Sequence, residues 1–246
     1  MKTLYLIWRQ PERRWWPVGR LRREGSTYVF EYTRGAIAAK AGGFRPLLSF
    51  PELDTAYVSS DLFPLFANRL PPSSRDDYKQ FVEALDLGDE RDPLVLLGRS
   101  GGERQTDTFE VFPAPERTPE GRFETTFFVR GLRYRPQETH EEVLRLRSGD
   151  GLTLEPEPDN PHDELAVRVL SDRRTHLGHV PRYLAPDVQH LRESGVDVVA
   201  RVRRVSPPPA PMQFRVLCEL SAEWPPEFSP LRSEEFEPLR ALVTSG

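Results

Sequence analysis

The stretch Asn160-Pro161-His162-Asp163 decides the fold of the second half of the chain. Prolines within and just before it exclude a helix, and the side chains of Asn160 and Asp163 can hydrogen-bond their own backbone to form a tight turn. The turn gathers an amide, an imidazole and a carboxylate within a few residues, and these groups are suited to recognising a ligand.

Apolar residues alternate with polar ones on both sides of this turn. They are Leu152 and Leu154 before it, Leu165, Val167 and Val169 after it, and Thr175 and Leu177 beyond a second turn at 172–174. A period of two is typical of β-strands with one buried face. The sequence therefore predicts three strands with a polar corner between the first two.

Three blocks around this corner resemble the HIRAN domain over roughly Phe127 to Ser221. The blocks are Gly131-Leu132-Arg133-Tyr134, then 151–167 with Glu157, Asn160, Pro161 and Asp163 in matching places, then Leu177-Gly178-His179-Val180-Pro181. HIRAN domains are small β-barrels related to the OB fold, and the best-understood examples bind the free 3′ end of single-stranded DNA. The resemblance implies an OB-like or SH3-like barrel with two short helices, and a DNA partner.

The resemblance also implies roles for individual residues. Arg133 and Tyr134 would hold phosphate and stack on a base, Asn160 and Asp163 would meet the base edge or the 3′-hydroxyl, and His179 would contact a phosphate or the neighbouring nucleotide. His162 replaces the family's aromatic residue in the turn and can still stack. The last base-stacking position falls at Met212 or Phe214.

Each of these residues also has a structural alternative. Asn160 and Asp163 can simply cap the turn, His179 can be a satisfied, half-buried histidine, and Tyr134 can belong to the barrel core. A metal site formed by His162, Asp163 and His179 is conceivable chemically, but nothing in the sequence fixes its geometry. We therefore expect no metal and no cofactor.

Charge argues against binding that depends mainly on electrostatics. The net charge is -4, and residues 127–221 carry 14 basic and 14 acidic side chains. A protein that grips a nucleic-acid backbone usually has a positive balance. We therefore expect a small site that reads one strand end, with weak dependence of affinity on salt.

Composition bounds the class of protein. The 246 residues are 37% hydrophobic and 29% charged, as in a globular protein, and no apolar run is long enough to span a bilayer or serve as a signal-peptide core. Cys218 is the only cysteine, which excludes an internal disulfide or a thiolate zinc site, and its apolar neighbours predict burial rather than reactivity. We expect a cytoplasmic protein that is not an enzyme.

Residues 1–112 resemble the N-terminal subdomain of HipA-type kinases. The resemblance rests on Phe63 to Pro71, on Val18-Gly19-Arg20-Leu21 and on Phe30 with Tyr32. It implies a β-rich domain that can exist apart from the kinase and bind a partner. The remaining residues are too few for a kinase body, so we do not expect a kinase.

Two helices are predicted in this first domain, near 73–87 and 92–98. The loop at 98–102 is glycine-rich, but it lacks the Gly-Lys-Ser/Thr ending of a phosphate cradle and follows a helix, so we interpret it as a turn. Trp8, Trp15 and Trp16 can stack on bases or, alternatively, cover a small sheet.

The whole chain is predicted to be α+β and mostly β, with two small domains. Residues 1–112 form the first, a proline-rich linker spans 113–122, the HIRAN-like barrel spans 123–221, and 222–246 form an acidic tail that either straps the body or binds a partner. The barrel contains a helix from Thr139 to about Arg147 that buries Val143, Leu144 and Leu146, a helix opening at Pro186, and strands at 196–205 and 213–220.

Two functions follow from these observations. The first is a non-catalytic accessory protein that recognises single-stranded DNA, with a preference for free 3′ ends, in DNA repair or genome defence. The alternative is an antitoxin-like interaction module that binds a HipA-type kinase or another partner through its N-terminal domain.

Overall fold

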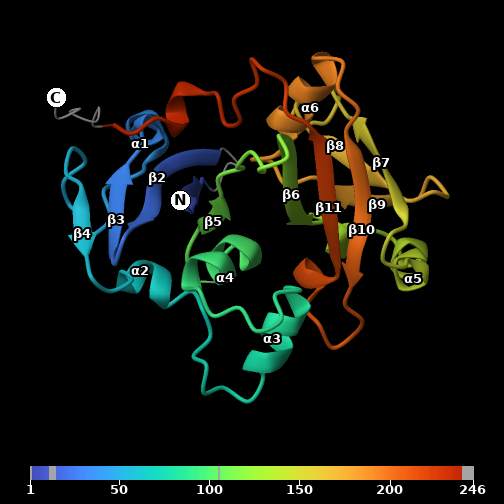
Figure 1. Cartoon of the computed structure of the whole chain (residues 1–246), viewed down its shortest axis with the longest axis horizontal. Coiled ribbons are helices and arrows are strands. Elements are labelled where there is room, and N and C mark those ends of the chain that lie inside the picture. Colours follow the sequence, from blue (N-terminus) through green and yellow to red (C-terminus); the bar gives the residue numbers. More distant parts are fainter. Residues whose placement is uncertain (1, 11–14, 105, 240–246) are drawn as a thin grey trace. The chain divides into compact units, whose positions relative to one another are not determined.

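A computed structural model of the chain describes residues 2–10, 15–104 and 106–239. These residues form two compact units, each with its own sheet (Figure 1). The N-terminal unit comprises residues 2–79, 89–114 and 232–239 within this range, and the C-terminal unit comprises 80–88 and 115–231. The predicted α+β fold, mostly β with few helices, is confirmed.

The N-terminal unit is built on a five-stranded antiparallel sheet in the order β4-β3-β2-β1-β5. Its strands are β1 (Thr3–Arg9), β2 (Trp15–Glu24), β3 (Thr27–Tyr32), β4 (Tyr57–Ser59) and β5 (Phe109–Pro113). Trp8 and Trp16 face each other across β1 and β2 and pack against the core, as expected if they cover the sheet.

Short helices and aromatic side chains complete this unit. The helices are α1 (Arg34–Ala39), α2 (Pro64–Ala67), α4 (Pro93–Ser100) and the 3₁₀ turns η1 (Lys40–Gly42) and η4 (Glu234–Phe236). Phe30 stacks on Phe50 with ring centroids 4.1 Å apart, and both rings are buried. These large aromatic side chains form part of the hydrophobic core of the unit, together with aliphatic residues.

Helix α4 is longer than predicted. The Asp92 carboxylate caps it by accepting a hydrogen bond from the Leu94 amide at 2.9 Å, and the helix ends only at Gly101, whose φ is 78°. Gly98 to Ser100 are therefore helical and not part of a turn, because the left-handed conformation that stops the helix lies at Gly101.

Helix α3 (Tyr78–Ala84) is shorter than the predicted 73–87 and begins later. The Arg75 amide donates to the Pro72 carbonyl and the Tyr78 amide to the Arg75 carbonyl, so this segment forms successive i to i+3 turns. Residues 80–88 belong to the C-terminal unit, where Asp86 pairs with Arg203 at 2.6 Å. The sequence-based domain boundaries placed residues 80–88 in the first domain.

The C-terminal unit is built on a six-stranded sheet in the order β6-β11-β10-β7-β8-β9. Its strands are β6 (Arg122–Phe128), β7 (Gly151–Pro156), β8 (Val167–Leu170), β9 (His176–His179), β10 (Val199–Val205) and β11 (Val216–Glu223). The three strands expected around the polar corner are thus β7, β8 and β9, and the side chains that alternate inward form one core.

Two α-helices and two 3₁₀ turns cover the barrel. They are α5 (Gln137–Arg145), α6 (Ala185–Glu193), η2 (Leu132–Tyr134) and η3 (Met212–Phe214). Figure 1 shows α5 and α6 at opposite ends of this sheet. On α6, Leu184, Val188 and Leu191 are buried, as their spacing predicted.

Three details of this unit differ from the sequence-based expectation. Helix α5 starts at Gln137, so Thr139 lies inside the helix rather than capping it, and Leu144 is 52% exposed because the helix presents Val143 to the core instead. Strand β10 begins at Val199 and not at 196. Residues 212–214 form η3, whose Phe214 amide bonds the Pro211 carbonyl, so β11 begins only at Val216.

The two edges of the six-stranded sheet meet at one antiparallel bridge between Arg130 and His179. The Arg130 amide donates to the His179 carbonyl at 2.8 Å and the His179 amide donates to the Arg130 carbonyl at 2.9 Å. Gly178 makes this approach possible, because a Cβ at this position would lie 2.3 Å from the Arg130 carbonyl oxygen. We call this junction the seam.

The segment after β11 is divided between the units. Trp224 and Phe228 pack on Phe123 in the C-terminal unit. Farther on, Phe236 packs on Tyr5 and the Leu239 amide donates to the Tyr32 carbonyl in the N-terminal unit. Both pieces of the described tail are therefore strapped onto folded structure.

Within the described ranges, no helix is both long and apolar enough to cross a membrane.

The first testable prediction concerns the seam. Gly178→Ala should destabilise the C-terminal unit by about 2–4 kcal/mol, because the added Cβ collides with backbone at 2.3 Å and the φ of 149° disfavours a side chain. Urea unfolding of the full chain measures the loss.

Gly195→Ala is the matched control. Its φ is 76°, and a Cβ there would meet nothing within 4 Å, so it should cost only about 1–2 kcal/mol of backbone strain. Equal losses for the two variants would show that closure of the seam does not require Gly178.

Candidate nucleic-acid interface

The seam positions an exposed pair of side chains, Arg133 and Tyr134. Immediately after the bridge at Arg130, Gly131 takes a φ of 79° and starts η2, which carries both residues. Tyr134 is 69% exposed, so the alternative that it belongs to the barrel core is wrong. The Arg133 guanidinium lies 4.6 Å from the centroid of the Tyr134 ring and donates to its hydroxyl. A cation over an exposed ring makes a platform on which planar groups can stack.

Asn160 holds the turn that was expected from the sequence. Its side-chain oxygen accepts from the His162 amide at 3.0 Å, and its side-chain amide donates to Glu157 Oε2 at 2.6 Å. The first contact is the turn-capping role considered above. The second ties the turn to the rest of the site. His162 itself is exposed.

Asp163 has partners for both of its oxygens. Oδ1 accepts from the Leu165 amide at 3.1 Å, and Oδ2 lies 3.0 Å from Arg182 Nε. The carboxylate therefore caps the second half of the turn and is also charge-compensated. An ionised carboxylate has about four acceptor positions, so these contacts leave room for another donor.

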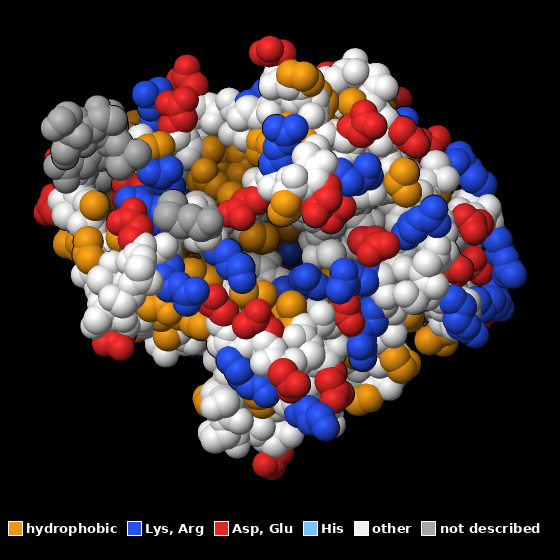
Figure 2. Space-filling view, viewed as in Figure 1, with side chains coloured by type: hydrophobic (Ala, Val, Ile, Leu, Met, Phe, Trp, Pro, Cys, Tyr) orange, Lys and Arg blue, Asp and Glu red, His pale blue; other side chains and the backbone are white. Residues whose placement is uncertain are grey.

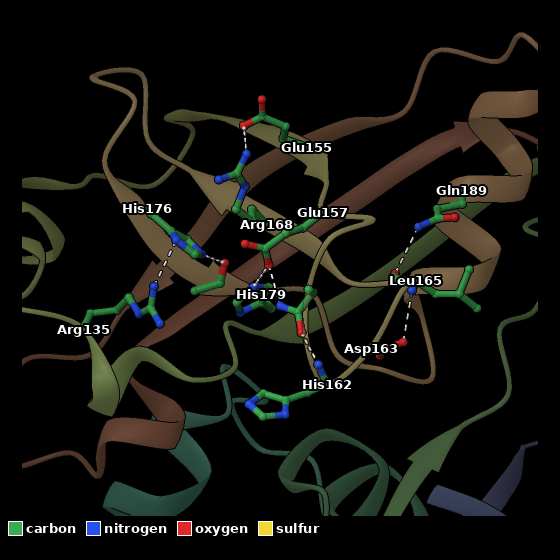
Figure 3. A network of polar contacts seen from close by, with 12 residues as sticks. Arg135, Glu155, Glu157, His162, Asp163, Leu165, Arg168, His176, His179 and Gln189 are labelled. Carbon is green, nitrogen blue, oxygen red and sulfur yellow. Dashed lines mark hydrogen bonds and ion pairs between the residues drawn. The ribbon is translucent and has the colours of Figure 1, made fainter. Parts of the chain in front are cut away.

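His179 connects β9 to the turn. Its Nε2 lies 2.8 Å from Glu157 Oε2, the same oxygen that accepts from Asn160 (Figure 3). Because an ionised carboxylate only accepts, His179 Nε2 carries the proton in this contact. Glu157 thus joins two of the expected site residues.

His176 and Arg135 extend the network on the other side of His179. The rings of His176 and His179 meet edge to face with centroids 4.9 Å apart. Arg135 Nη1 lies 3.0 Å from His176 Nδ1, and His176 Nε2 lies 3.0 Å from the Gly178 carbonyl oxygen (Figure 3). An arginine can only donate, so His176 accepts at Nδ1 and donates from Nε2.

The surroundings shift the pKa values of two groups in this network. Partial burial opposes ionisation of Glu157, but the hydrogen bonds from Asn160 and His179 outweigh it and lower its pKa. Burial, followed by the positive charge of Arg135, lowers the pKa of His176. At neutral pH Glu157 is therefore an anion and His176 is neutral.

The two candidates for the last stacking position both lie in η3. Phe214 packs on Phe128 and Phe81, with ring centroids 5.1 and 6.2 Å apart. Met212 is half-buried at the start of η3, which contacts η2. Met212 packs against the core of the unit, and both residues are half-buried, so the structure does not choose between them.

Several charges near the site are paired. On the face drawn in Figure 2, basic and acidic side chains of the described residues are interspersed. Near the turn, Arg168 and Arg174 both pair with Glu155, at 3.1 and 3.5 Å. Among the described residues, no three histidine, cysteine or acidic side chains gather as a metal site would require.

Each half of the chain matches a known family. Residues 123–224 match the HIRAN domain, and residues 14–104 match the HipA N-terminal domain. The chain carries a HIRAN domain. Both resemblances seen in the sequence are confirmed.

Solved structures of HIRAN domains are similar to the C-terminal unit. The crystal structure of the HIRAN domain of human HLTF is 18% identical with a TM-score of 0.30, and the match covers 43% of this chain and 79% of that chain. The NMR structure of the HLTF domain in its DNA-bound conformation is 17% identical with a TM-score of 0.27, covering 42% and 74%.

A protein from Lactobacillus plantarum is 23% identical with a TM-score of 0.34, covering 42% of this chain and 97% of that one. At these scores the three structures add nothing to the family match. Comparison with curated proteins found no match.

Several residues of the HIRAN site were missed in the sequence. Glu157 was matched to the family pattern but was given no role, and Arg182, which directly follows the last matching block, was not considered. Arg135 and His176 meet only through the closed barrel. Their contact has no local sequence signal.

His176 predicts how the HIRAN domain responds to pH. Its folded-state pKa lies below the ordinary value of 6.5, so the unfolded chain takes up the proton first. The stability that this group contributes is present above pH 6.5 and is lost as pH falls through 6.5 toward the folded-state pKa. The midpoint temperature of thermal unfolding should therefore fall more between pH 7.5 and 5.5 for the unchanged full chain than for the His176→Gln variant.

The exposed His162 supplies a control, because His162→Gln should keep the pH response of the unchanged protein. If the His176→Gln variant also kept the full pH response of the midpoint temperature, His176 would not be the titrating group.

Proposed function

We propose that the HIRAN domain of this chain binds single-stranded DNA at a free 3′ end, as a cytoplasmic, non-catalytic accessory protein in DNA repair or genome defence. The observation that carries the proposal is the exposed stack of Arg133 on Tyr134 beside the seam. The family match of residues 123–224 supports it.

Stacking would supply affinity without regard to sequence. Arg133 covers one face of the Tyr134 ring, and because Tyr134 as a residue is 69% exposed, a base would stack on the part of the ring that Arg133 leaves open. Such contacts are worth about 1–3 kcal/mol per base. Met212 on the adjacent η3 would offer an apolar surface to the same strand.

The polar corner would recognise the strand end. A terminal hydroxyl can donate to an acceptor position that Asp163 has left open, whereas a terminal phosphate brings like charge to it. Arg182 lies 3.0 Å from Asp163 and offsets part of that repulsion. We therefore expect moderate discrimination, in favour of the free end.

A non-catalytic role agrees with the state of the single thiol. Cys218 is fully buried in β11, and burial raises the pKa of its thiol far above the ordinary value. A buried, protonated thiol is not a nucleophile.

The proposal predicts a preference for one kind of strand end. Oligonucleotides with a 3′-hydroxyl should bind about tenfold more tightly than the same strands with a 3′-phosphate, and Asp163→Asn should remove the difference while keeping the turn cap at Leu165. Fluorescence anisotropy with the full chain measures both affinities.

The platform is tested in the same assay. Tyr134→Ala should weaken binding of every sequence about tenfold by loss of stacking, whereas Tyr134→Phe keeps the ring and most of the affinity. Equal affinity of the unchanged protein for the two end types would contradict the end-capture mechanism. A Tyr134→Ala variant that binds strands as tightly as the unchanged protein would contradict the stacking role of Tyr134.

A second candidate function belongs to the N-terminal unit, which matches the HipA N-terminal domain over 14–104. Leu48 is fully exposed and Val58, on edge strand β4, is 63% exposed. An open strand edge with apolar residues is suited to a protein partner. Under this alternative the unit would bind a HipA-type kinase that lacks its own N-terminal domain.

The alternative makes a separate prediction. Leu48→Asp combined with Val58→Glu should abolish co-elution with such a kinase in gel filtration and leave DNA binding unchanged. Glu52→Gln, an exposed change in the same region, is the control. Co-elution that survives the double substitution would remove this surface from consideration.

A further inference from the structure

Residues 80–88 pack on the C-terminal unit, and we call them the cover. The chain enters this unit at Gln80 and leaves it after Gly88, although these residues lie outside the HIRAN match and inside the HipA match. Val82 and Leu85 are 3% and 0% exposed, so the cover is docked rather than loosely attached. A segment from outside a domain that docks on it can control access to the surface beneath.

The surface beneath the cover is basic because of an irregularity in β10. The register of β10 against β11 shifts between Val202 and Arg204, so Arg203 is an extra residue in the strand. A bulge of this kind re-aims side chains that would otherwise alternate between the two faces of the sheet. Here both arginines reach one carboxylate of the cover: Arg203 Nε lies 2.6 Å from Asp86 Oδ2, and Arg204 Nη1 lies 3.5 Å from Asp86 Oδ1.

An aromatic side chain completes the covered surface. Phe214 on η3 packs on Phe128 with ring centroids 5.1 Å apart, and Phe81 of the cover meets it edge to face at 6.2 Å. The end of β10 pairs with the start of β11, so the two arginines and this ring lie at one end of the sheet. η3 also contacts η2, which carries Arg133 and Tyr134. The covered surface is therefore continuous with the platform beside the seam.

The cover presents to this surface the two kinds of group that a single strand would present. A carboxylate offers anionic oxygens as a phosphate does, and an aromatic ring offers an apolar surface as a base does. Asp86 takes the place of the first and Phe81 the place of the second. The surface thus has the chemistry of a nucleic-acid contact, and the cover occupies it.

The ion pairs of the cover are weak enough to be exchanged. The side chains of Arg203 and Asp86 are 42% and 29% exposed, and ion pairs with this access to water contribute little to stability. Within the described ranges, Arg204 Nε is buried without a hydrogen-bond partner, and the 3.5 Å between its Nη1 and Asp86 is long for a hydrogen bond. A phosphate group has oxygens for both arginines.

The backbone of the cover forms hydrogen bonds within the cover itself. The amides of Leu85, Asp86 and Leu87 donate to carbonyls of the same segment, so these bonds move with it. Arg203 Nη1 also lies 4.0 Å from Glu219 Oε2, so this arginine keeps a counter-charge when Asp86 moves away. Displacement therefore costs mainly the burial of the apolar side chains that dock the cover.

We propose that Arg203, Arg204 and Phe214 form a second contact surface for single-stranded DNA, which the cover occupies until a strand displaces it. The strand end lies at the seam, and phosphates and a base farther along the strand lie on this surface. The inference rests on the function proposed for the seam. The cover lowers the observed affinity, because only the uncovered fraction of the chains makes both contacts.

Asp86→Asn tests the cover. Asp86 has a φ of 55°, and asparagine also tolerates this left-handed conformation but does not form ion pairs with the arginines. The variant should bind a 3′-hydroxyl strand of about 12 nucleotides roughly three- to tenfold more tightly than the unchanged chain, and a strand of about 4 nucleotides equally tightly. Fluorescence anisotropy with the full chain measures both affinities, and thermal unfolding checks that the variant folds.

Asp89→Asn is the matched control, because it changes the net charge equally. Asp89 is fully exposed and lies 3.7 Å from Arg91 rather than against β10. This variant should leave both affinities unchanged.

Salt dependence identifies the groups that the cover releases. Two arginines that neutralise phosphates of a single strand add about 1.4 to the slope of log affinity against log salt concentration. Asp86→Asn should show this steeper slope with the longer strand, and adding Arg203→Met and Arg204→Met should remove both the gain in affinity and the added slope. An Asp86→Asn variant that binds the longer strand no more tightly than the unchanged chain would overturn the proposal.

Hydrogen exchange separates a failure of this inference from a failure of the proposed function. Adding the longer strand to the unchanged chain should slow the exchange of amides 130–135 at the seam and speed the exchange of amides 80–88 as the cover leaves. Slower exchange at the seam with unchanged or slower exchange at 80–88 would refute the cover and leave the function of the seam standing. No change at either segment would contradict the proposed function and the cover with it.

Discussion

The close approach of Gly178 to the Arg130 carbonyl is the contact on which the candidate site depends. A side chain at 178 would lie 2.3 Å from that oxygen, so the two edges of the sheet can meet only because this residue is glycine. The meeting point determines where η2 begins and therefore where Tyr134 is presented. It also brings β9, with its two histidines, beside the turn at 160–163. A packing requirement of the barrel thus assembles a polar surface from three separate segments.

Charge compensation is the second feature of this surface. Glu157 is held by Asn160 and His179, and Asp163 by Arg182. Because these carboxylates are already paired, the proposed recognition of a strand would rest on stacking and on hydrogen bonds at short range.

The sequence predicted local features well and contacts across the fold poorly. The turn at Asn160 and Asp163, the buried stripe of α6 and the burial of Cys218 all follow from spacing and residue type, and the structure agrees. Helix ends were less predictable: α3 starts late because i to i+3 turns precede it, and α4 runs on to Ser100, where Gly101 stops it. The pairing of Arg135 with His176 and the exposure of Leu144 depend on how the barrel closes and on which face of α5 it covers. No local pattern encodes either of them.

Hydrogen exchange of the full chain, with and without a single strand bearing a 3′-hydroxyl, tests the central claim most directly. If the seam holds the strand end, amides of 130–135, 157–165 and 176–182 should exchange more slowly when the strand is present, and the N-terminal sheet should be unchanged. Protection confined to the N-terminal unit, or none at strand concentrations that saturate binding, would contradict the assignment of the strand to the HIRAN seam.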